Sequence, residues 1–291
     1  MSPTSQDRFD WVTLTSDYGV AGVFVGVCKG AIAQVAPQVR FLDVCHLIAA
    51  QDIEHAASTL GAAAPYLPVA VHLALVDPMH IPPSRGVVVH TADGSLLVGP
   101  DNGVLCRAID ELGGAVDAAE AANPELWRDT VHPTFRGRDV FAPIAGHLAN
   151  GTPMAEVGPQ IDPATLTVLA DREVEVDHDH VHGEVAVVDH FGNLSLNIVR
   201  SDLEAAGISF GDMVEIRCNG RSAHIPFAAT YAEVPRGRLA VCEDAFHAVM
   251  LAVNAGDASR ELRVQRGDPV VISRLPQIPV RAGAQRIGIA P

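Results

Sequence analysis

The segment VAVHLALVDP, residues 69–78, decides the fold of the first half of this chain. From Val69 to Val76 its residues are apolar except for His72, and the run ends at Asp77-Pro78. Because proline disfavours a helical conformation of the residue before it, the chain must turn at Asp77. A near-continuous apolar run of this length predicts a strand of a parallel sheet that is covered on both faces.

The segments around this strand alternate between strand and helix patterns. Strands are predicted at 11–15, 40–44 and 69–76. Two more, at 86–91 and 95–98, form a hairpin around Asp93-Gly94. Helices are predicted at 23–35, 51–64, 102–112 and 139–149. This alternation is typical of an α/β fold. We therefore predict a Rossmann-like, mostly parallel sheet with helices on both faces.

The second half has a different pattern, in which short β-type runs are separated by glycine-containing turns. These runs lie at 184–188, 194–199, 213–218, 239–241, 249–253 and 269–273. Their spacing predicts a smaller, antiparallel, β-barrel-like C-terminal domain. We expect an α/β domain over residues 8–170 and a β-rich domain over 171–291.

Composition excludes several function classes. The formal net charge of −15 disfavours nucleic acid as a partner, because phosphate binding requires a basic surface. No apolar run reaches the ~18 residues of a membrane span, and the first ten residues are polar. The five cysteines include no CxxC pair, which favours free thiols in a reducing compartment. We therefore expect a cytoplasmic protein without membrane partners.

Candidate site residues follow two of the predicted strands. Asp17 follows the first strand and Asp77 the third, and ligands of open α/β sheets bind beyond such carboxyl ends. A loop with His80 and Arg85 comes directly after Asp77. Two plainer interpretations stay open: Asp17 as a helix cap, and the loop as ordinary surface.

Two further motifs carry groups suited to ligand binding. Arg136 and Arg138 flank Gly137, an arrangement that serves either as an anion site or as an arginine–aspartate lock for the loop. Phe191 and Asn193 combine a stacking face with an amide, as in purine recognition; the plainer alternative is a β-turn in which Gly192 supplies an unusual backbone angle.

The tract Asp177-His178-Asp179-His180-Val181-His182 has the composition of a metal site. On a strand its three histidines would share one face and could bind zinc. We prefer a solvated linker or strand edge, and therefore expect no metal and no cofactor. The chain also lacks the GxGxxG, GxxxxGK[ST] and GxSxG motifs of dinucleotide, nucleoside-triphosphate and serine-hydrolase sites.

Taken together, nine segments resemble one family in order and spacing, the S-adenosylmethionine hydroxide adenosyltransferases, which are relatives of the fluorinating and chlorinating adenosyl enzymes. The segments are TSDYG, VGVCKG, LDVCH, QDIEHAA, VDP, VGPDNGVL, PTFRGRDVFAP, HLANG and VVDHFGNLSLNI. The resemblance implies a homotrimer with active sites between subunits. It also implies attack of water or hydroxide on C5′ of S-adenosylmethionine, which gives adenosine and methionine without a metal or cofactor.

The resemblance further implies roles for particular residues. Asp17 is expected to hold the ribose hydroxyls, and Asp77 falls on the catalytic aspartate of the hydrolysing members. Three residues are expected to line the adenine and methionine side of the pocket: Asp189, Phe191 and Asn193. Tyr231 is expected to be another aromatic residue of the pocket.

The sequence departs from the family pattern at the residues expected to carry out the reaction. Arg136 replaces the motif histidine, and arginine cannot act as a base near neutral pH. Ser84 occupies the catalytic arginine position, with Arg85 directly after it. The candidate catalytic residues are therefore Asp77, Arg85 and Arg136, with His80 as a replacement imidazole.

Other departures concern the ligand. Gly22 replaces an acidic residue, and Ala245 and Phe246 replace polar or basic groups near the methionine carboxylate. Two alternatives to hydrolysis follow: a non-catalytic protein that binds an adenosyl ligand, and adenosyl transfer to another nucleophile such as halide. The halogenating relatives, however, carry Tyr-Ser where this chain has Arg136-Gly137.

Overall fold

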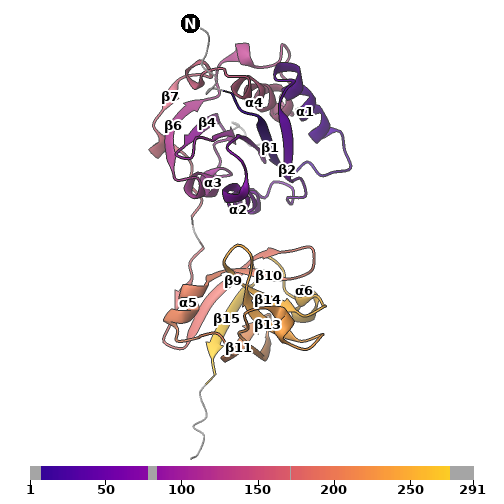
Figure 1. Ribbon diagram of the computed structural model, residues 1–291, viewed down its shortest axis with the longest axis vertical. Helices are drawn as coiled ribbons and strands as arrows, with labels where there is room; N and C mark the ends of the chain where they lie inside the picture. The colour runs from indigo at the N-terminus through magenta and orange to yellow at the C-terminus, as the bar shows by residue number, and fades with distance from the viewer. Residues whose placement is uncertain (1–7, 78–83, 171, 276–291) are drawn as a thin grey trace, which may run out of the picture. The chain divides into compact units, whose positions relative to one another are not determined.

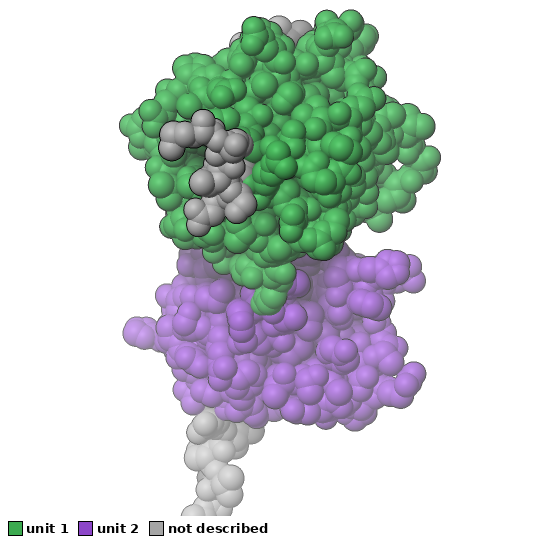
Figure 2. Space-filling model, turned by 45° about the horizontal axis from the view of Figure 1, so that its top comes forward, with its two compact units in different colours: residues 1–170 green, residues 171–291 purple. Residues whose placement is uncertain are grey.

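The computed structural model describes residues 8–77, 84–170 and 172–275. The chain forms two compact units, Met1–Ala170 and Asp171–Pro291, coloured separately in Figure 2. Each unit has its own hydrophobic core. Within the described ranges, no helix has both the length and the apolar character needed to cross a membrane.

The first unit is built on a seven-stranded sheet with the order β2-β1-β3-β5-β4-β6-β7 (Figure 1). Its strands are β1 (Trp11–Ser16), β2 (Arg40–Cys45), β3 (Val71–Leu75), β4 (Gly86–Thr91), β5 (Leu96–Pro100), β6 (Ala115–Glu120) and β7 (Gln160–Ile161). Strands β2, β1, β3 and β5 are parallel, whereas β4, β6 and β7 pair antiparallel. The predicted α/β class is confirmed, with an antiparallel extension after β5.

Helices cover both faces of this sheet. Helices α1 (Phe24–Val35) and α4 (Ala142–Ala149) contribute to one core, and α2 (Ile53–Ala63) and α3 (Cys106–Glu111) to the other. Strand β3 supplies side chains to both: Leu73 and Leu75 face the first core and Ala74 the second. The apolar run around β3 is therefore buried on both faces, as its sequence predicts.

The strand order creates a topological switch point beside β1. The chain passes from β1 to β2 on one side and returns through α2 to β3 on the other. Ser16 at the end of β1 lies opposite Leu75 at the end of β3. The residues that follow these two strands, Asp17 and Asp77, therefore share the edge where open α/β sheets bind ligands.

The second unit is an antiparallel, nearly closed barrel, which confirms the predicted class. Its main strands are β9 (His180–Val188), β10 (Leu194–Val199), β11 (Met213–Cys218), β12 (Arg221–Pro226), β13 (Leu239–Glu243), β14 (Ala248–Val253) and β15 (Pro269–Arg274). They follow the order β12-β11-β15-β9-β10-β14-β13, and a bridge between Phe227 and Val241 joins the two ends. Short elements complete the unit: β8 (Glu175–Val176), α5 (Arg200–Ala205) and α6 (Ala258–Leu262).

Several boundaries differ from the sequence predictions. Helix α3 begins at Cys106 rather than at 102, because the Asn102 side chain accepts from Val104 N and donates to the carbonyl of Val76. Strand β9 begins at His180 rather than 184, because its first residues pair with β8 and β15. Strands β6 and β12 were not predicted.

Candidate active site

The centre of the candidate site is an ion pair at the carboxyl end of β3. Nη1 of Arg136 lies 3.1 Å from Oδ2 of Asp77, and both side chains are about one-fifth exposed. The same Nη1 donates to the backbone carbonyl of Ser84 at 2.8 Å. The guanidinium also lies over the ring of Phe141, 5.0 Å from its centroid. Asp77 is thus held by an arginine from the segment that precedes α4.

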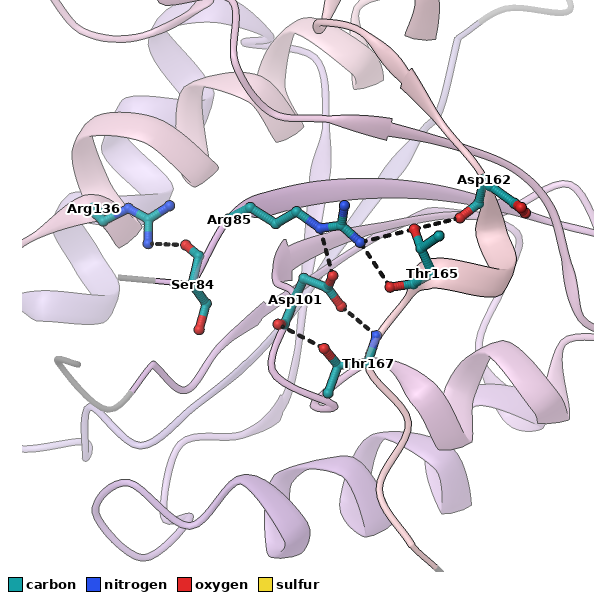
Figure 3. A network of polar contacts seen from close by, with 7 residues as sticks. All are labelled: Ser84, Arg85, Asp101, Arg136, Asp162, Thr165 and Thr167. Atoms are coloured by element: carbon teal, nitrogen blue, oxygen red, sulfur yellow. Dashed lines mark hydrogen bonds and ion pairs between the residues drawn. The ribbon is translucent and has the colours of Figure 1, made fainter. Parts of the chain in front are cut away.

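Arg85 belongs to a separate network (Figure 3). Its Nε donates to Oδ2 of Asp101 at 2.7 Å, and its Nη2 donates to the carbonyl of Thr165 at 2.9 Å. Asp101 also accepts from the backbone of Thr167. In Figure 3 the Arg85 side chain extends away from Arg136 toward Thr165. The structure therefore joins Arg136 to Asp77 and uses Arg85 to tie β4 to the segment around 165.

Asp17 lies in the loop after β1 and is held from the α2 side. Its Oδ2 accepts the backbone N–H of Gln51 at 2.8 Å, and Gln51 has a left-handed φ of 65°. The remainder of the Asp17 carboxylate is available for a ligand such as a diol. Asp17 does not cap the following helix, because α1 begins at Phe24 and its N-cap residue is Val23.

A series of hydrogen-bonded side chains supports the loop that carries Asp17. Ser16 Oγ lies 2.8 Å from His46 Nδ1, and His46 Nε2 lies 2.9 Å from Asp43 Oδ1. Lys29 completes the chain with a 2.7 Å bond to Asp43. Burial opposes ionisation of Asp43, but the bonds from Lys29 and His46 outweigh it and lower its pKa. The carboxylate therefore accepts from His46 Nε2, which leaves Nδ1 to accept from Ser16.

Tyr18, the residue after Asp17, is largely buried. Burial raises the pKa of Tyr18 far above its ordinary value, and Cys28, Asp17 and Asp77 act in the same direction. The phenol thus remains a neutral donor close to both carboxylates. Its ring packs against Phe135 at 5.7 Å, and a Cβ atom on Gly137 would collide with its hydroxyl oxygen. Gly137 is therefore required by the close approach of Tyr18.

The second arginine of the motif has a structural role. Arg138 binds Asp139 through two bonds of 2.6 and 2.7 Å, and Asp139 is fully buried. The Arg138 bonds are the main cause of the lowered pKa of Asp139, which also accepts from the backbone of His132. The residues Gly137–Phe141 form a π-helix, a form often found at functional sites. The two arginines thus serve two carboxylates rather than one anion site.

In the second unit, the β9–β10 loop carries three predicted pocket residues. Asp189 Oδ1 accepts from the backbone N–H groups of Phe191 and Asn193, and its Oδ2 accepts from Asn193 Nδ2 at 2.7 Å. Gly192 adopts a φ of 82° against Asp257. The loop is consequently rigid, and it exposes 73% of Phe191.

Two predicted site residues remain, Tyr231 and His80. Tyr231 begins the short 3-10 helix η6 (Tyr231–Glu233) beside β13 and is 44% exposed. His80 lies outside the described residues. Asp17, Asp77 and Arg136 are thus grouped in the first unit, and Asp189, Phe191 and Asn193 in one loop of the second.

Sequence reasoning missed the supporting chain of Ser16, His46, Asp43 and Lys29. The usable signal was the spacing of Asp43 and His46 in LDVCH, which places an imidazole three residues after a carboxylate. It also missed Asn102, whose amide donates to the carbonyl of Val76 immediately before Asp77. This bond fixes the backbone that presents the central carboxylate.

Comparison with known proteins gives consistent results. The model of the SAM hydroxide adenosyltransferase N-terminal domain matches residues 12–158, and that of the C-terminal domain matches 183–271. The chain is 40% identical to an (R)-S-adenosyl-L-methionine hydrolase of Salinispora arenicola, over 90% of this chain and 97% of the relative. A hydrolase of the same name from Thermus thermophilus is 35% identical, over 89% and 98%. A fluorinase of Nocardia brasiliensis is 29% identical, over 79% and 85%.

The fold is also shared with a solved structure. An uncharacterized conserved protein from Thermotoga maritima superimposes with a TM-score of 0.84 at 33% identity, covering 91% of this chain and all of that one. Both domain models match in order, and the hydrolase relatives align over nearly their full length. The chain belongs to the SAM hydroxide adenosyltransferase family.

Proposed function

We propose that this protein hydrolyses S-adenosylmethionine, with the (R) configuration at sulfur, to adenosine and methionine. Water or hydroxide attacks C5′ of the ribose, and the thioether of methionine leaves. The observation that carries the proposal is the Asp77–Arg136 pair, 3.1 Å apart, at the edge where β1 and β3 end. The relatives named as hydrolases of this substrate support the choice of reaction.

The chemistry requires little from the protein beyond position and one proton acceptor. A sulfonium departs as a neutral thioether, so no general acid is needed. Holding the attacking water in line contributes about 7–11 kcal/mol. We assign proton acceptance to the carboxylate of Asp77 and the orientation of that carboxylate to Arg136, since arginine itself cannot accept a proton.

Substrate binding is divided between the other predicted residues. We assign the ribose hydroxyls to Asp17, whose second oxygen is held by Gln51 N. The exposed ring of Phe191 and the amide of Asn193 serve the adenine and methionine side. The rigid Asp189 turn supports this role, because a preformed loop loses little conformational entropy on binding.

The test uses ¹⁸O-labelled water. Attack at C5′ transfers the label to the 5′ hydroxyl of adenosine and leaves methionine unlabelled, and mass spectrometry of both products reads this directly. Asp77→Asn is expected to abolish product while retaining substrate binding. Asp110→Asn, an exposed position on α3, is the matched control and should keep full activity.

Other outcomes identify the alternatives. Substrate binding without any product would replace hydrolysis with a binding function. A halogenated nucleoside formed in the presence of fluoride or chloride would identify a different nucleophile. Unlabelled adenosine would contradict attack of water at C5′.

We also propose that the active protein is a homotrimer with active sites between subunits. Its support is an exposed apolar stripe formed by Val20 and Val23, just before α1, and by Phe24 and Val27 on the helix itself. The stripe continues into an open groove of about 560 Å³ lined by Gly26, Val27 and Gly30. Such a surface is buried when copies of the chain associate.

Light scattering during gel filtration tests this assembly. The wild type should elute with three chain masses, and Val23→Asp should reduce the mass because it places a charge in the apolar contact. Val168→Asp is the control, since Val168 is 72% exposed and Val23 71%. A monomer for the wild type would contradict the proposal. For the compartment we propose the cytoplasm, supported by five free cysteines.

A further inference from the structure

We infer that the second unit contains a binding site for a divalent transition-metal ion, formed by Asp177, His180 and His182. Each residue offers one ligand atom, and these atoms lie within 4.8 Å of one another. None of the three belongs to the proposed adenosyl site. The site is independent of the proposed hydrolysis.

The hairpin of β8 and β9 explains why these side chains converge. Glu175 pairs with His182 and Val176 with Val181. Since side chains alternate along a strand, His180 and His182 share one face, together with Glu175. Val181 points the other way and is completely buried in the barrel core. The core therefore fixes which face the imidazoles occupy.

The backbone around the cluster is held on both sides. Asp177 N donates to the carbonyl of His180, which closes the hairpin turn. On the other side β9 pairs with β15, where His182 lies opposite Val271 and His180 opposite Ser273. The two imidazoles are consequently carried by a strand inside a sheet, the kind of rigid element on which metal ligands keep their geometry, and Asp177 belongs to the adjoining turn.

His180 shows the arrangement expected of a metal-binding imidazole. Its Nδ1 lies 2.7 Å from Asp179 Oδ1, and its Nε2 lies 2.9 Å from Asp177 Oδ2. Because a carboxylate only accepts, Asp179 fixes a proton on Nδ1 and orients the ring. A dication can then take the place of the proton between Nε2 and Asp177. The ring of His182, 4.9 Å from that of His180, supplies the third ligand.

The ligand set selects the class of metal. Two imidazoles and one carboxylate suit zinc and its first-row neighbours, with water at the remaining positions. Metal–ligand bonds of about 2.0–2.2 Å require ligand atoms roughly 3.3–3.5 Å apart, so side-chain movements of about 1 Å would complete the site. The acidic surroundings and the net charge of −15 favour a cation. Binding would hold the β8–β9 turn against β9.

Calorimetry with Zn²⁺ tests the inference on the full-length chain without a histidine tag, after dialysis against a chelator. We expect one equivalent per chain. His180→Ala and His182→Ala should each weaken binding more than about 100-fold, and Asp179→Asn about 10-fold, as expected for an outer carboxylate. Co²⁺ absorption provides a second readout, since coordination by two imidazoles gives a d–d spectrum that the variants should lose.

His224→Ala is the matched control, because His224 is an exposed histidine on β12 outside the cluster. It should leave affinity and stoichiometry unchanged. Far-UV circular dichroism of the metal-free variants verifies that each one folds. Retention of the equivalent in the double variant His180→Ala/His182→Ala, or equal weakening by His224→Ala, would show adventitious binding by surface histidines and overturn the inference.

Discussion

The hydroxyl of Ser16 lies 2.8 Å from Nδ1 of His46, and both side chains are buried. Ser16 also accepts the backbone N–H of Tyr18, and His46 O accepts from Gly19 N. The pair thus holds both ends of the turn that presents Asp17. The Asp17 side chain is therefore presented by a turn that is hydrogen-bonded at both ends.

Replacing Ser16 tests this support. Ser16→Ala leaves Nδ1 of His46 buried without its partner, at a cost of about 1–3 kcal/mol. Because the change acts through Asp17, we expect KM for S-adenosylmethionine to rise more than kcat falls. Urea unfolding and steady-state kinetics measure both effects. Ser222→Ala, at an exposed position on β12, is the control and should change neither.

Replacing Arg136 tests the central ion pair. Arg136→Met removes the bonds to Asp77 and Ser84 while keeping much of the side-chain volume over Phe141. We expect kcat to fall at least about 100-fold, the effect of a misplaced catalytic group. Stability should change little, because the pair is partly solvated. Arg200→Met, which breaks the exposed pair with Glu204, is the control. Full activity of Arg136→Met would contradict the assigned role.

The stability of the protein should decrease in mild acid because of His72. This residue is 1% exposed, and burial lowers its pKa from 6.5 to about 4. The unfolded chain therefore binds more protons between these values, and stability falls as pH drops from about 6.5 to about 4. The contribution of this one group is about 3 kcal/mol.

A double variant isolates the effect of His72. His72 Nδ1 pairs with Thr13 Oγ1 at 2.8 Å, so Thr13→Val/His72→Leu removes both partners together and leaves neither of them buried alone. Urea midpoints at pH 7 and pH 5 should differ less in this variant than in the wild type. An unchanged difference would assign the acid sensitivity to other groups.

Gly192 tests the rigidity of the β9–β10 loop. Its φ is 82°, and a Cβ atom would collide with the Asp257 carboxylate. Gly220 has a φ of 68° but faces open space. Gly220→Ala should therefore cost only the left-handed strain of about 1–2 kcal/mol. Gly192→Ala should cost more and also raise KM, as denaturant unfolding and kinetics will measure. Equal losses of unfolding free energy in Gly192→Ala and Gly220→Ala would exclude the collision with Asp257.

Much of the fold could be predicted from sequence where the pattern coincides with burial. β10 and β11 have the predicted bounds, and along both strands buried side chains alternate with less buried ones. β12 was missed because RSAHIP is polar and ends in proline, and it forms through pairing with β11. β6 was missed because AVDAAE has weak β propensity and is placed by β4. Tertiary pairing therefore overrode local preference at both strands.

The candidate site divides in the same way. Asp17 and Asp77 could be predicted because they follow strands whose ends are set by hydrophobic pattern. The direction of a long side chain could not: the sequence offered both Arg85 and Arg136 as candidate catalytic residues with Asp77, but of these two only Arg136 pairs with it. Each guanidinium is oriented by a residue far away in the sequence. Arg136 donates to the carbonyl of Ser84, and Arg85 donates to the carbonyl of Thr165.

The contact between Gly137 and Tyr18 couples the residues that this sequence can carry at the two positions. Any side chain at position 137, even the single methyl group of alanine, would place its Cβ against the Tyr18 hydroxyl. A larger residue at 137 therefore requires the phenol to move or a smaller residue to replace Tyr18, and the two positions can only be redesigned together.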